Sequence, residues 1–367
     1  MRIEDPLIVG AGPAGCAAAI RLGQAGAAPL LLDRDEEVGD PLCGGFLSWR
    51  TAEQLASLGL SPAALGAHRV TRLRLFDGPR EAALDLPHAA WGLSRHALDT
   101  AMRARALASG AKLEFDAVRA VDGLAVEGRA ASYRPQSLFL ATGKHDVRGE
   151  TRPREAKDTA LGLRLRLPPT PERLRLLGGA IELHLFPGGY VGIVLQEGGS
   201  ANLCLAMRKS ALAKAGGSPE ALFARLAQAN PALAARLGDD WRQVRCDTIG
   251  AVPYGFIARD TSPGLFRLGD QAAVIPSLAG EGISIALASG AMAAEHWTHG
   301  GPAAAPAYQR AFASSARLPV TLASAAWHAA ETRLGARAAL ALARIAPSLV
   351  AGFADRARIA APSLAPR

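Results

Sequence analysis

Three closely spaced glycines near the start of the chain could hold a phosphate against the backbone. Gly10, Gly12 and Gly15 directly follow the apolar run 7–9. In a strand–turn–helix unit, the first glycine of this spacing allows a tight turn and the second lets a pyrophosphate approach. The third lets the helix pack closely on the strand. The free N–H groups and the dipole of that helix favour an anion at its start. The spacing therefore predicts a dinucleotide site.

Asp33 supports this interpretation from the end of a second apolar run, 30–32. The helix between the two runs is expected to begin at about Pro13, a residue suited to an early helical position, and to stop near Gly26. An acidic side chain about 20 residues beyond the glycines is placed where ribose hydroxyls need an acceptor. The strand, the glycines, the helix, the second strand and the acid thus occur in the order that a dinucleotide-binding unit requires.

A second glycine-rich corner lies late in the chain and could contact a flat ring. Asp270 ends a strand-like run and can accept hydrogen bonds from hydroxyl groups. Gly280 and Gly282 would let the backbone approach a planar group closely. The helix expected from Ile283 directs its positive end toward that group, which would stabilise negative charge there.

Length, charge and cysteine usage narrow the class of protein. The chain has 367 residues, of which 49% are hydrophobic, enough for about two domains or one elaborated domain. The net charge of +8 comes mostly from scattered arginines, and no basic motif carries interleaved aromatics, so we expect no nucleic-acid partner. Cys16, Cys43, Cys204 and Cys246 show neither CxxC pairing nor metal-ligand spacing with histidine. We expect free thiols, no metal and a reducing compartment.

Further along the chain, helical and strand-like segments alternate. Ser94 is a good N-cap for a helix that Gly110 should end. Strand-like stretches follow at 112–121, 123–128 and 137–143, and antiparallel strands are expected over 180–207. A helical region covers 218–237, and the chain from Pro302 onward is rich in alanine and helical in pattern.

These segments together resemble the glutathione-reductase-type FAD fold of flavoprotein monooxygenases and geranylgeranyl reductases, up to about Trp297. The resemblance rests on GAGPAG with Asp33, on Arg95 in SRHALD, and on Gly269 and Asp270 with the GEGIS segment. It implies an FAD molecule whose pyrophosphate lies near Arg95 and whose ribityl chain donates to Asp270. The glycine loop at the later helix start would face the N1/O2 edge of the flavin ring.

The resemblance also implies a domain plan. It gives an α/β protein: a Rossmann-like FAD-binding domain with an inserted, mostly antiparallel β-sheet substrate domain and C-terminal helices. The expected ranges are 1–150 and 250–300 for the FAD-binding domain, with part of 65–92 free to join the substrate sheet, 151–249 for the substrate domain, and 301–367 for the helical end. The expected FAD contacts are Gly10, Gly12, Pro13, Ala14, Gly15, Asp33, Arg34, Cys43, Gly44, Arg95, Val118, Gly143, Gly269, Asp270, Pro276, Gly280, Gly282 and Ile283.

Two reactions of the family compete. The sequence has one dinucleotide loop, so NAD(P)H would dock transiently or electrons would come from another donor. Hydroxylases of the family usually carry Asp-Gly where this chain has Thr142 and Gly143, whereas the segment PLCGGFLS resembles geranylgeranyl reductases and would bring Cys43 near the flavin. The reductase substrate pattern is partly met, since Tyr190 aligns but Gly192 takes the tryptophan position. The signature of flavin halogenases is not visible.

Because hydroxylation is the commoner activity of this fold, the leading expectation is a single-component monooxygenase acting on a hydrophobic aromatic or polyketide-like molecule. A geranylgeranyl-reductase-like enzyme acting on C=C bonds of a prenyl or lipid substrate is the first alternative, and a non-catalytic FAD-binding module is the second. Candidate catalytic residues are Cys43, Tyr190 and His184, each of which could instead serve packing alone.

The first strand begins almost at the N-terminus and no charge-free run of about 20 apolar residues occurs, so we expect a cytoplasmic protein without a signal peptide or spanning helix. A basic amphipathic segment near the C-terminus allows a second location. Its arginine stripe contains Arg333, Arg337 and Arg344, its apolar stripe contains Leu342, Ile345, Leu349 and Phe353, and Pro347 should kink or end the helix. This segment would rest on a membrane surface or pack on its own protein.

Overall fold

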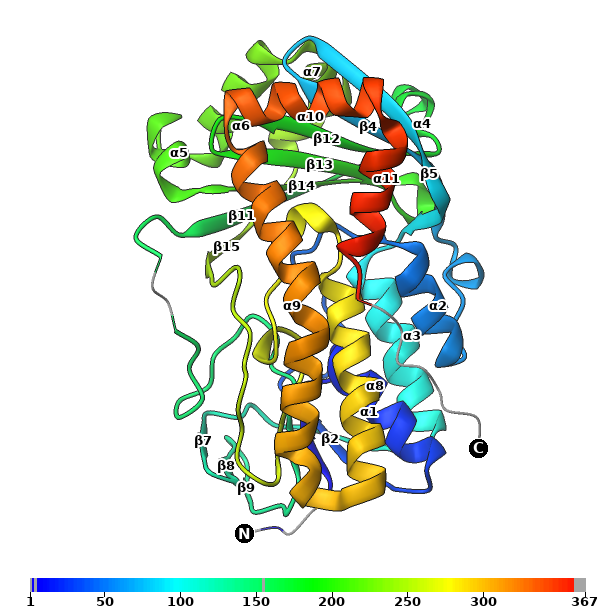
Figure 1. The fold of residues 1–367 in the computed structure, drawn as a ribbon, viewed down its shortest axis with the longest axis vertical. Coiled ribbons are helices and arrows are strands. Elements are labelled where there is room, and N and C mark those ends of the chain that lie inside the picture. The colour runs from blue at the N-terminus through cyan, green and yellow to red at the C-terminus, as the bar shows by residue number, and fades with distance from the viewer. Residues whose placement is uncertain (1, 3–4, 154–155, 360–367) are drawn as a thin grey trace.

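The computed structural model describes residues 2, 5–153 and 156–359, and places a five-stranded parallel sheet at the centre of the first domain (Figure 1). The strand order is β16-β10-β1-β2-β6. The strands are β1 (Leu7–Val9), β2 (Leu30–Asp33), β6 (Lys112–Phe115), β10 (Leu138–Leu140) and β16 (Leu265–Arg267). Most of their side chains are apolar, and those of β1 and β10 are buried throughout, as expected for the centre of a parallel sheet covered on both faces.

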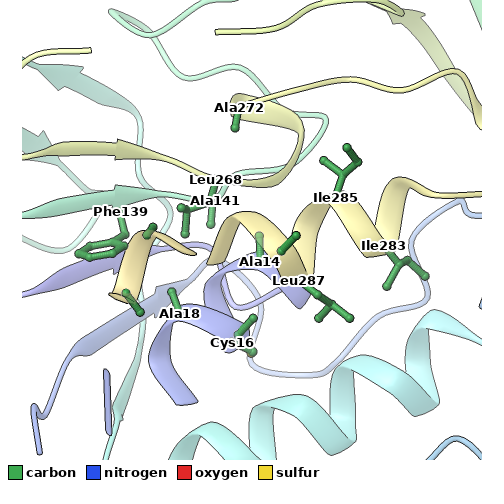
Figure 2. Close-up of a cluster of buried hydrophobic side chains, with 14 of the residues drawn as sticks. Ala14, Cys16, Ala18, Phe139, Ala141, Leu268, Ala272, Ile283, Ile285 and Leu287 are labelled. Atoms are coloured by element: carbon green, nitrogen blue, oxygen red, sulfur yellow. The ribbon is translucent and has the colours of Figure 1, made fainter. Parts of the chain in front are cut away.

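Helices α1 (Pro13–Gln24), α3 (Arg95–Ala108) and α8 (Gly282–Gly300) cover this sheet. Figure 2 shows the packing of α1 against α8, where small residues such as Ala14 and Ala18 lie at the contact. A Cβ added to Gly290 of α8 would stand 2.3 Å from the Ala14 carbonyl oxygen. Only glycine therefore allows α8 to approach α1 this closely, and this approach positions the start of α8 beside the glycine turn.

The second sheet has eight strands in the order β15-β11-β14-β13-β12-β4-β5-β3 and is mostly antiparallel. Two long strands from the first part of the chain, β4 and β5, join it, and β12 pairs with β4 in parallel. The bounds are β3 (Phe46–Leu47), β4 (His68–Asp77), β5 (Arg80–Gly92), β11 (Ala160–Leu167), β12 (Ala180–Phe186), β13 (Gly189–Leu195), β14 (Ala201–Arg208) and β15 (Cys246–Val252). The expected fold class is confirmed.

Two groups of helices cover the second sheet. On one face, α4 (Pro171–Leu177), α6 (Pro219–Ala229) and α7 (Pro231–Leu237) pack on alternate residues of β11, β13 and β14. On the other face, α9 (Ala305–Ala330) and α10 (Arg333–Ile345) pack through Trp327 and Leu340. Helix α9 runs the length of the molecule from the parallel sheet to the second sheet (Figure 1). The remaining helices are α2 (Trp49–Ser57), α5 (Lys209–Lys214) and α11 (Pro347–Arg356).

Two sequence-based element boundaries were wrong. The strand expected over 112–121 is divided into β6 and β7 (Ala120–Asp122), and β7 belongs to a three-stranded sheet with β8 (Ala125–Glu127) and β9 (Ser132–Tyr133). The chain leaves the parallel sheet at Asp116, whose carboxylate accepts the backbone N–H groups of Arg129, Ala130 and Ala131. The helix expected over 218–237 is interrupted at Asn230, whose side chain caps α7 by accepting from the Leu233 N–H.

Candidate functional site

The glycine turn after β1 leaves the start of α1 bare. Gly10 has a positive φ of +106°, and a Cβ on it would stand 2.4 Å from the Ala141 carbonyl oxygen. A Cβ on Gly15 would stand 1.9 Å from the carbonyl oxygen of Gly10. Gly12 is the N-cap of α1, and none of the side chains that the structure describes caps the helix there. The first N–H groups of α1 are therefore available to an anion, and Pro13 and Ala14 form the first turn of that helix.

Asp33 is held at the rim of this turn. One carboxylate oxygen accepts the N–H of Ala11 at 2.7 Å, and the other accepts the N–H of Asp35 at 3.0 Å. The Arg103 guanidinium lies 3.6 Å away. These contacts fix the orientation of the carboxylate while leaving lone pairs for further donors. Arg34 points into solvent and pairs with Asp35 at 2.8 Å, so it reaches the site only as a surface charge.

Arg95 lies beside the glycine turn. Its guanidinium makes two hydrogen bonds to Asp99, at 2.8 and 2.6 Å, and its Nη2 would lie 3.6 Å from a Cβ on Gly12. Burial lowers the pKa of Arg95, but the Asp99 carboxylate outweighs it, with help from Cys43 and Asp270, and the net pKa is raised. A cation thus stands beside the uncapped start of α1.

The Asp270 corner is built by buried side chains from distant segments. The backbone N–H of Gly269 donates to Ser289 at 2.8 Å, and the carbonyl oxygen of Asp270 accepts from Arg152 at 3.0 Å. Gln271 donates to Thr142 at 2.9 Å and to the carbonyl oxygens of Gly143 and His145 at 3.0 and 3.1 Å. Within the described part of the chain, the Asp270 carboxylate makes no hydrogen bond of its own, which leaves it free to accept from a hydroxyl group.

The loop before α8 approaches the second sheet. Gly280 has a positive φ of +68°, and a Cβ on it would stand 2.8 Å from the ring of Phe46. Gly282, the first residue of α8, has no atom within 4 Å of the position of an added Cβ. The side chain of Ile283 is buried in the core, so this residue offers only its backbone. The start of α8 is therefore open on the Gly282 side and presents N–H groups there.

Glu281 occupies the N-cap position of α8, where its burial could not be predicted from its neighbours in the sequence. The residue is 1% exposed, and its carboxylate lies 3.0 Å from the Arg358 guanidinium, which in turn stacks on Trp49. Burial raises the pKa of Glu281 to about 7, and Arg358 offsets only part of that rise. A carboxyl group that titrates near neutral pH thus stands at the helix end that faces the open corner.

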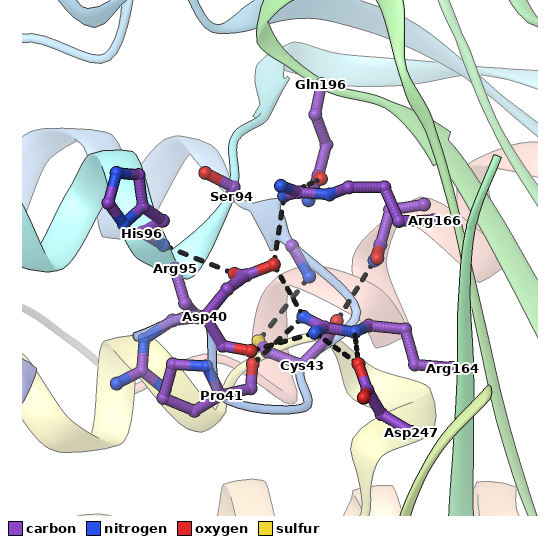
Figure 3. A network of polar contacts seen from close by, with 12 residues as sticks. Asp40, Pro41, Cys43, Ser94, Arg95, His96, Arg164, Arg166, Gln196 and Asp247 are labelled. Atoms are coloured by element: carbon purple, nitrogen blue, oxygen red, sulfur yellow. Dashed lines mark hydrogen bonds and ion pairs between the residues drawn. The ribbon is translucent and has the colours of Figure 1, made fainter. Parts of the chain in front are cut away.

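The loop 38–45 is anchored to the second sheet through charged groups, which Figure 3 shows. The carboxylate of Asp40 accepts from Arg164 at 2.9 Å, lies 3.1 Å from Arg166, and accepts the N–H of His96 at 3.2 Å. Arg164 is also paired with Asp247 at 2.6 Å. Both arginines come from β11, so this network holds the loop of the FAD-binding domain against the sheet of the other domain.

Asn202 of β14 holds the Cys43–Gly44 backbone directly. Its amide nitrogen donates to the carbonyl oxygens of Cys43 and Gly44 at 3.0 and 2.8 Å. The N–H of Gly45 lies 3.4 Å from the Cys43 sulfur. Cys204 lies two residues beyond Asn202 on the same strand and so on the same face of the sheet. The structure therefore brings Cys43 to the face of the second sheet that carries Asn202 and Cys204.

Tyr190 reaches the segment before α8. Its hydroxyl donates to Ser277 at 2.9 Å, and the hydroxyl of Tyr254 lies 2.8 Å from the same Ser277 oxygen. The rings of both tyrosines pack edge-on against Trp327. Ser277 directly follows Pro276, so the two tyrosines lie beside the corner that Gly280 completes.

The structure does not bring His184 to this site. Tyr190 is paired with Leu185, so His184, the next residue along β12, points to the opposite face of the sheet. There its ring bonds to Glu182 and Asn230, both at 3.1 Å, and stacks on Phe76. His184 is thus buried among polar and aromatic partners on the face of the sheet opposite to Tyr190, away from the other candidate residues.

The other expected contacts lie around the same parallel sheet. Val118 is half-buried in the segment between β6 and β7 and packs on the cluster under β1 and β2. Gly143 has a positive φ of +61° just beyond β10. Sequence reasoning missed Gln271, Asn202, Ser277, Tyr254 and Glu281. Only Gln271 had a local signal, because it adjoins Asp270, whereas the others act through partners far away in the sequence.

These observations fit an FAD molecule. The bare start of α1 with Arg95 suits the pyrophosphate, Asp33 suits the ribose, and the unpartnered Asp270 carboxylate suits the ribityl chain. Backbone without side chains at Gly44 and Gly282, where nothing lies near an added Cβ, suits a flat ring. The assignment of each residue to a part of the cofactor remains a prediction from geometry.

Comparisons with known proteins agree with this fit. Residues 5–147 match the family model described as "FAD binding domain". A digeranylgeranylglycerophospholipid reductase from Methanopyrus kandleri is 26% identical over 317 residues, which cover 79% of this chain and 76% of the relative.

Two solved structures share the fold. A flavin-dependent brominase superposes with a TM-score of 0.75 at 16% identity and covers 96% of this chain and 93% of its own. A probable FAD-dependent monooxygenase from Pseudomonas aeruginosa superposes with a TM-score of 0.70 at 18% identity, covering 92% and 99%. Both the expected cofactor, FAD, and the expected enzyme class are confirmed by these matches. The chain is therefore an FAD-dependent oxidoreductase, built on the fold that flavoprotein monooxygenases and geranylgeranyl reductases share.

Proposed function

We propose that this oxidoreductase reduces carbon–carbon double bonds in an isoprenoid chain, the substrate class that the name of its Methanopyrus relative indicates. The observation that carries the proposal is the set of side chains beside the Gly280 corner. Burial raises the pKa of Cys204 and of Tyr254 to about 12, and raises that of Tyr190 well above 10. All three are weak acids that keep their protons at neutral pH.

Saturation of a double bond requires a hydride at one carbon and a proton at the other. Reduced FAD supplies the hydride when it is bound. The chain must supply the proton, and a hydroxyl or thiol group that is protonated at neutral pH can donate one. A base that accepts a substrate proton would instead need to be deprotonated at the working pH. Groups that can donate this proton stand on the chain, and the reductase relative supports reduction over hydroxylation, although hydroxylation is the commoner reaction of this fold.

Tyr190 is the proposed proton donor because its proton can be replaced. Its hydroxyl is bonded to Ser277, and Ser277 is bonded to Tyr254. Tyr190 is nearly fully buried, whereas Tyr254 is half-buried and has access to solvent. When Tyr190 releases its proton to substrate, the Ser277 hydroxyl can rotate to donate to it, and Tyr254 can donate to Ser277 in turn. The three hydroxyls thus form a short path from solvent to the buried donor.

The face around Tyr190 suits an apolar substrate. Leu183, Leu185 and Trp327 surround the tyrosine on this side of the sheet. Gly192 faces the same side, and a Cβ on it would meet only ordinary contacts, the nearest at 3.5 Å from the Tyr190 ring. The family pattern places a tryptophan there. The absent side chain leaves room beside Tyr190, so the substrate pocket should differ in shape from that of the family.

The test uses the FAD-loaded enzyme without oxygen. The flavin is reduced chemically, a geranylgeranyl lipid is added, and flavin reoxidation and product mass are followed. We expect reoxidation without air and a product that gains two hydrogens for each bond reduced. Tyr190→Phe should slow reoxidation and alter its pH profile, with FAD affinity unchanged. Reoxidation that requires oxygen and yields a product with one more oxygen atom would establish hydroxylation instead and overturn the proposal.

The electron donor is tested in the same apparatus. We propose that NAD(P)H docks transiently, since the chain has a single dinucleotide cradle and that cradle suits FAD. Anaerobic bleaching of the flavin absorbance on addition of NADPH or NADH would support this. Bleaching by a quinol alone would assign electron supply to a different donor.

A further inference from the structure

We propose that the outward face of α10 and α11 docks on the surface of an anionic lipid bilayer. Large apolar side chains gather there in contact with solvent. Leu334 is 80% exposed, Ile345 is 84% exposed and Leu349 is 63% exposed, and Leu342 and Phe353 are also exposed. Five of the nine exposed large apolar residues of the described chain therefore lie within a single helix pair, which we call the C-terminal patch.

Helix α10 is apolar on two faces. Its inner face, formed by Ala336, Leu340 and Ala343, is buried against β4, β5 and β12. Leu334, Leu342 and Ile345 recur at helical spacing on the outer side. A helix that packs on one side and meets water on the other normally has a polar outer face. Among the described residues, no element covers Leu334 or Ile345 of this outer stripe, which indicates an external apolar partner.

Arginines border the outer stripe. Arg333 and Arg337 are exposed on the first turns of α10, and Arg344 is exposed near its end, where it also bonds to the Glu81 carbonyl oxygen. Residues 333–356 contain four arginines and one acidic residue, Asp355, a net charge of +3. An apolar stripe beside basic side chains is the pattern of a helix that lies in the interface of an anionic membrane.

The geometry favours a helix pair lying on the bilayer. No single described helix is long and apolar enough to cross a membrane, and α10 with α11 meets that criterion only as a pair bent by 113°. Pro347 at the start of α11 causes the break. Because the inner face of α10 is packed on the second sheet, the pair would expose that packed face if it left the protein.

A second copy of the chain is a weaker candidate for this partner. A twofold contact through the outer stripe would bring the arginines of both copies close together, and like charges repel. An anionic bilayer instead pairs each arginine with a phosphate. The patch also lies directly outside the cluster that contains Tyr190 and Trp327. Docking would therefore hold the proposed substrate face near the bilayer, although binding itself does not depend on the proposed reaction.

The test is sedimentation of the FAD-loaded protein with vesicles of phosphatidylcholine alone and of phosphatidylcholine with phosphatidylglycerol. We expect binding to the anionic vesicles that weakens with salt. Ile345→Glu with Leu349→Glu should abolish sedimentation. Arg333→Gln with Arg337→Gln should weaken it by about tenfold or more, since each basic residue near an anionic surface contributes about 1 kcal/mol.

Leu318→Glu is the matched control, because Leu318 is an exposed leucine of α9 outside the patch, and it should bind as the wild type does. Unchanged thermal midpoints would show that the variants fold. The proposal is overturned if wild type stays in solution with anionic vesicles at low salt, or if the glutamate double variant still sediments. A dimer that the same double variant dissociates would assign the patch to self-association and overturn it as well.

Discussion

Replacing Glu281 by glutamine should remove a loss of stability that the protein suffers as the pH rises toward 7. The carboxyl group is almost completely buried at the N-cap of α8, and its ion-pair partner within the described chain is Arg358 at 3.0 Å. A helix N-terminus and an arginine both favour the ionised form, yet burial has the larger effect and raises the pKa from 4.5 to about 7. Ionised Glu281 is therefore unfavourable in the folded state.

The direction of the pH dependence follows from that raised pKa. Below pH 4.5 the group is protonated in both the folded and unfolded states, and its full contribution to stability is present. As the pH rises from 4.5 through 7, Glu281 ionises in the unfolded chain but stays largely protonated in the folded chain, so stability is lost. The loss between pH 5 and pH 8 amounts to about 2 to 3 kcal/mol. Glutamine has nothing to ionise, and Glu281→Gln should escape this loss.

The assay is urea unfolding of wild type and Glu281→Gln at several pH values, with FAD saturating and after FAD removal. The free energy of unfolding of the variant, minus that of wild type, should grow by about 2 to 3 kcal/mol from pH 5 to pH 8. Glu53→Gln is the control, because Glu53 is an exposed glutamate of α2 and its difference from wild type should stay flat. A flat difference for Glu281→Gln, or one that shrinks as the pH rises, would refute the reasoning.

Three further substitutions test the site. Gly15→Ala places a Cβ 1.9 Å from the Gly10 carbonyl oxygen, so it should abolish FAD binding measured by fluorescence. Gly352→Ala in α11, where an added Cβ would meet only the end of Arg356 at 3.9 Å, should bind FAD normally, and tight binding by Gly15→Ala would contradict the cradle. Arg95→Gln leaves Asp99 buried without its partner, so the free energy of unfolding measured in urea should fall by about 3 kcal/mol and FAD binding should weaken at least tenfold. Unchanged FAD affinity would show that Arg95 is not part of the site. Asn202→Asp replaces a group that donates to the carbonyl oxygens of Cys43 and Gly44 by one that can only accept, so it should slow anaerobic flavin reoxidation more than Asn202→Ala does. Equal rates for the two variants would argue against the anchoring of the loop 38–45 by Asn202.

The parts of the fold that sequence predicted are those whose signals are local. The apolar runs that became β1 and β2, the glycines between them and Asp33 all occur within 27 residues, and each places its neighbour directly. Ser94 caps α3 as its type and position predict, with its side chain accepting from Ala97. Pro347 begins α11 where a proline must interrupt α10.

The parts that sequence did not predict depend on contacts between distant segments. Asn202 donates a hydrogen bond to the carbonyl oxygen of Cys43, 159 residues away, and the sequence pattern of β14 does not predict this contact. His184 and Tyr190 lie on neighbouring strands and were both candidates for the site. The register of β12 with β13 pairs Tyr190 with Leu185, so His184 and Tyr190 point to opposite faces of the sheet. The pairing of Glu281 with Arg358 joins the glycine corner to the C-terminal end of the described chain, and only the tertiary structure brings these residues together.

The position of the flavin-ring loops depends on the second sheet more than on the domain that contains them. The loop 38–45 has little regular structure, and its charged and backbone groups are held by Arg164, Arg166 and Asn202 of the sheet. Tyr190 of the same sheet fixes Ser277 on the other side of the corner. A sheet that fixes both loops makes ring geometry and substrate geometry interdependent. Substitutions on this face of the sheet should therefore alter the reaction rate even where they contact neither FAD nor substrate, because they shift both loops together.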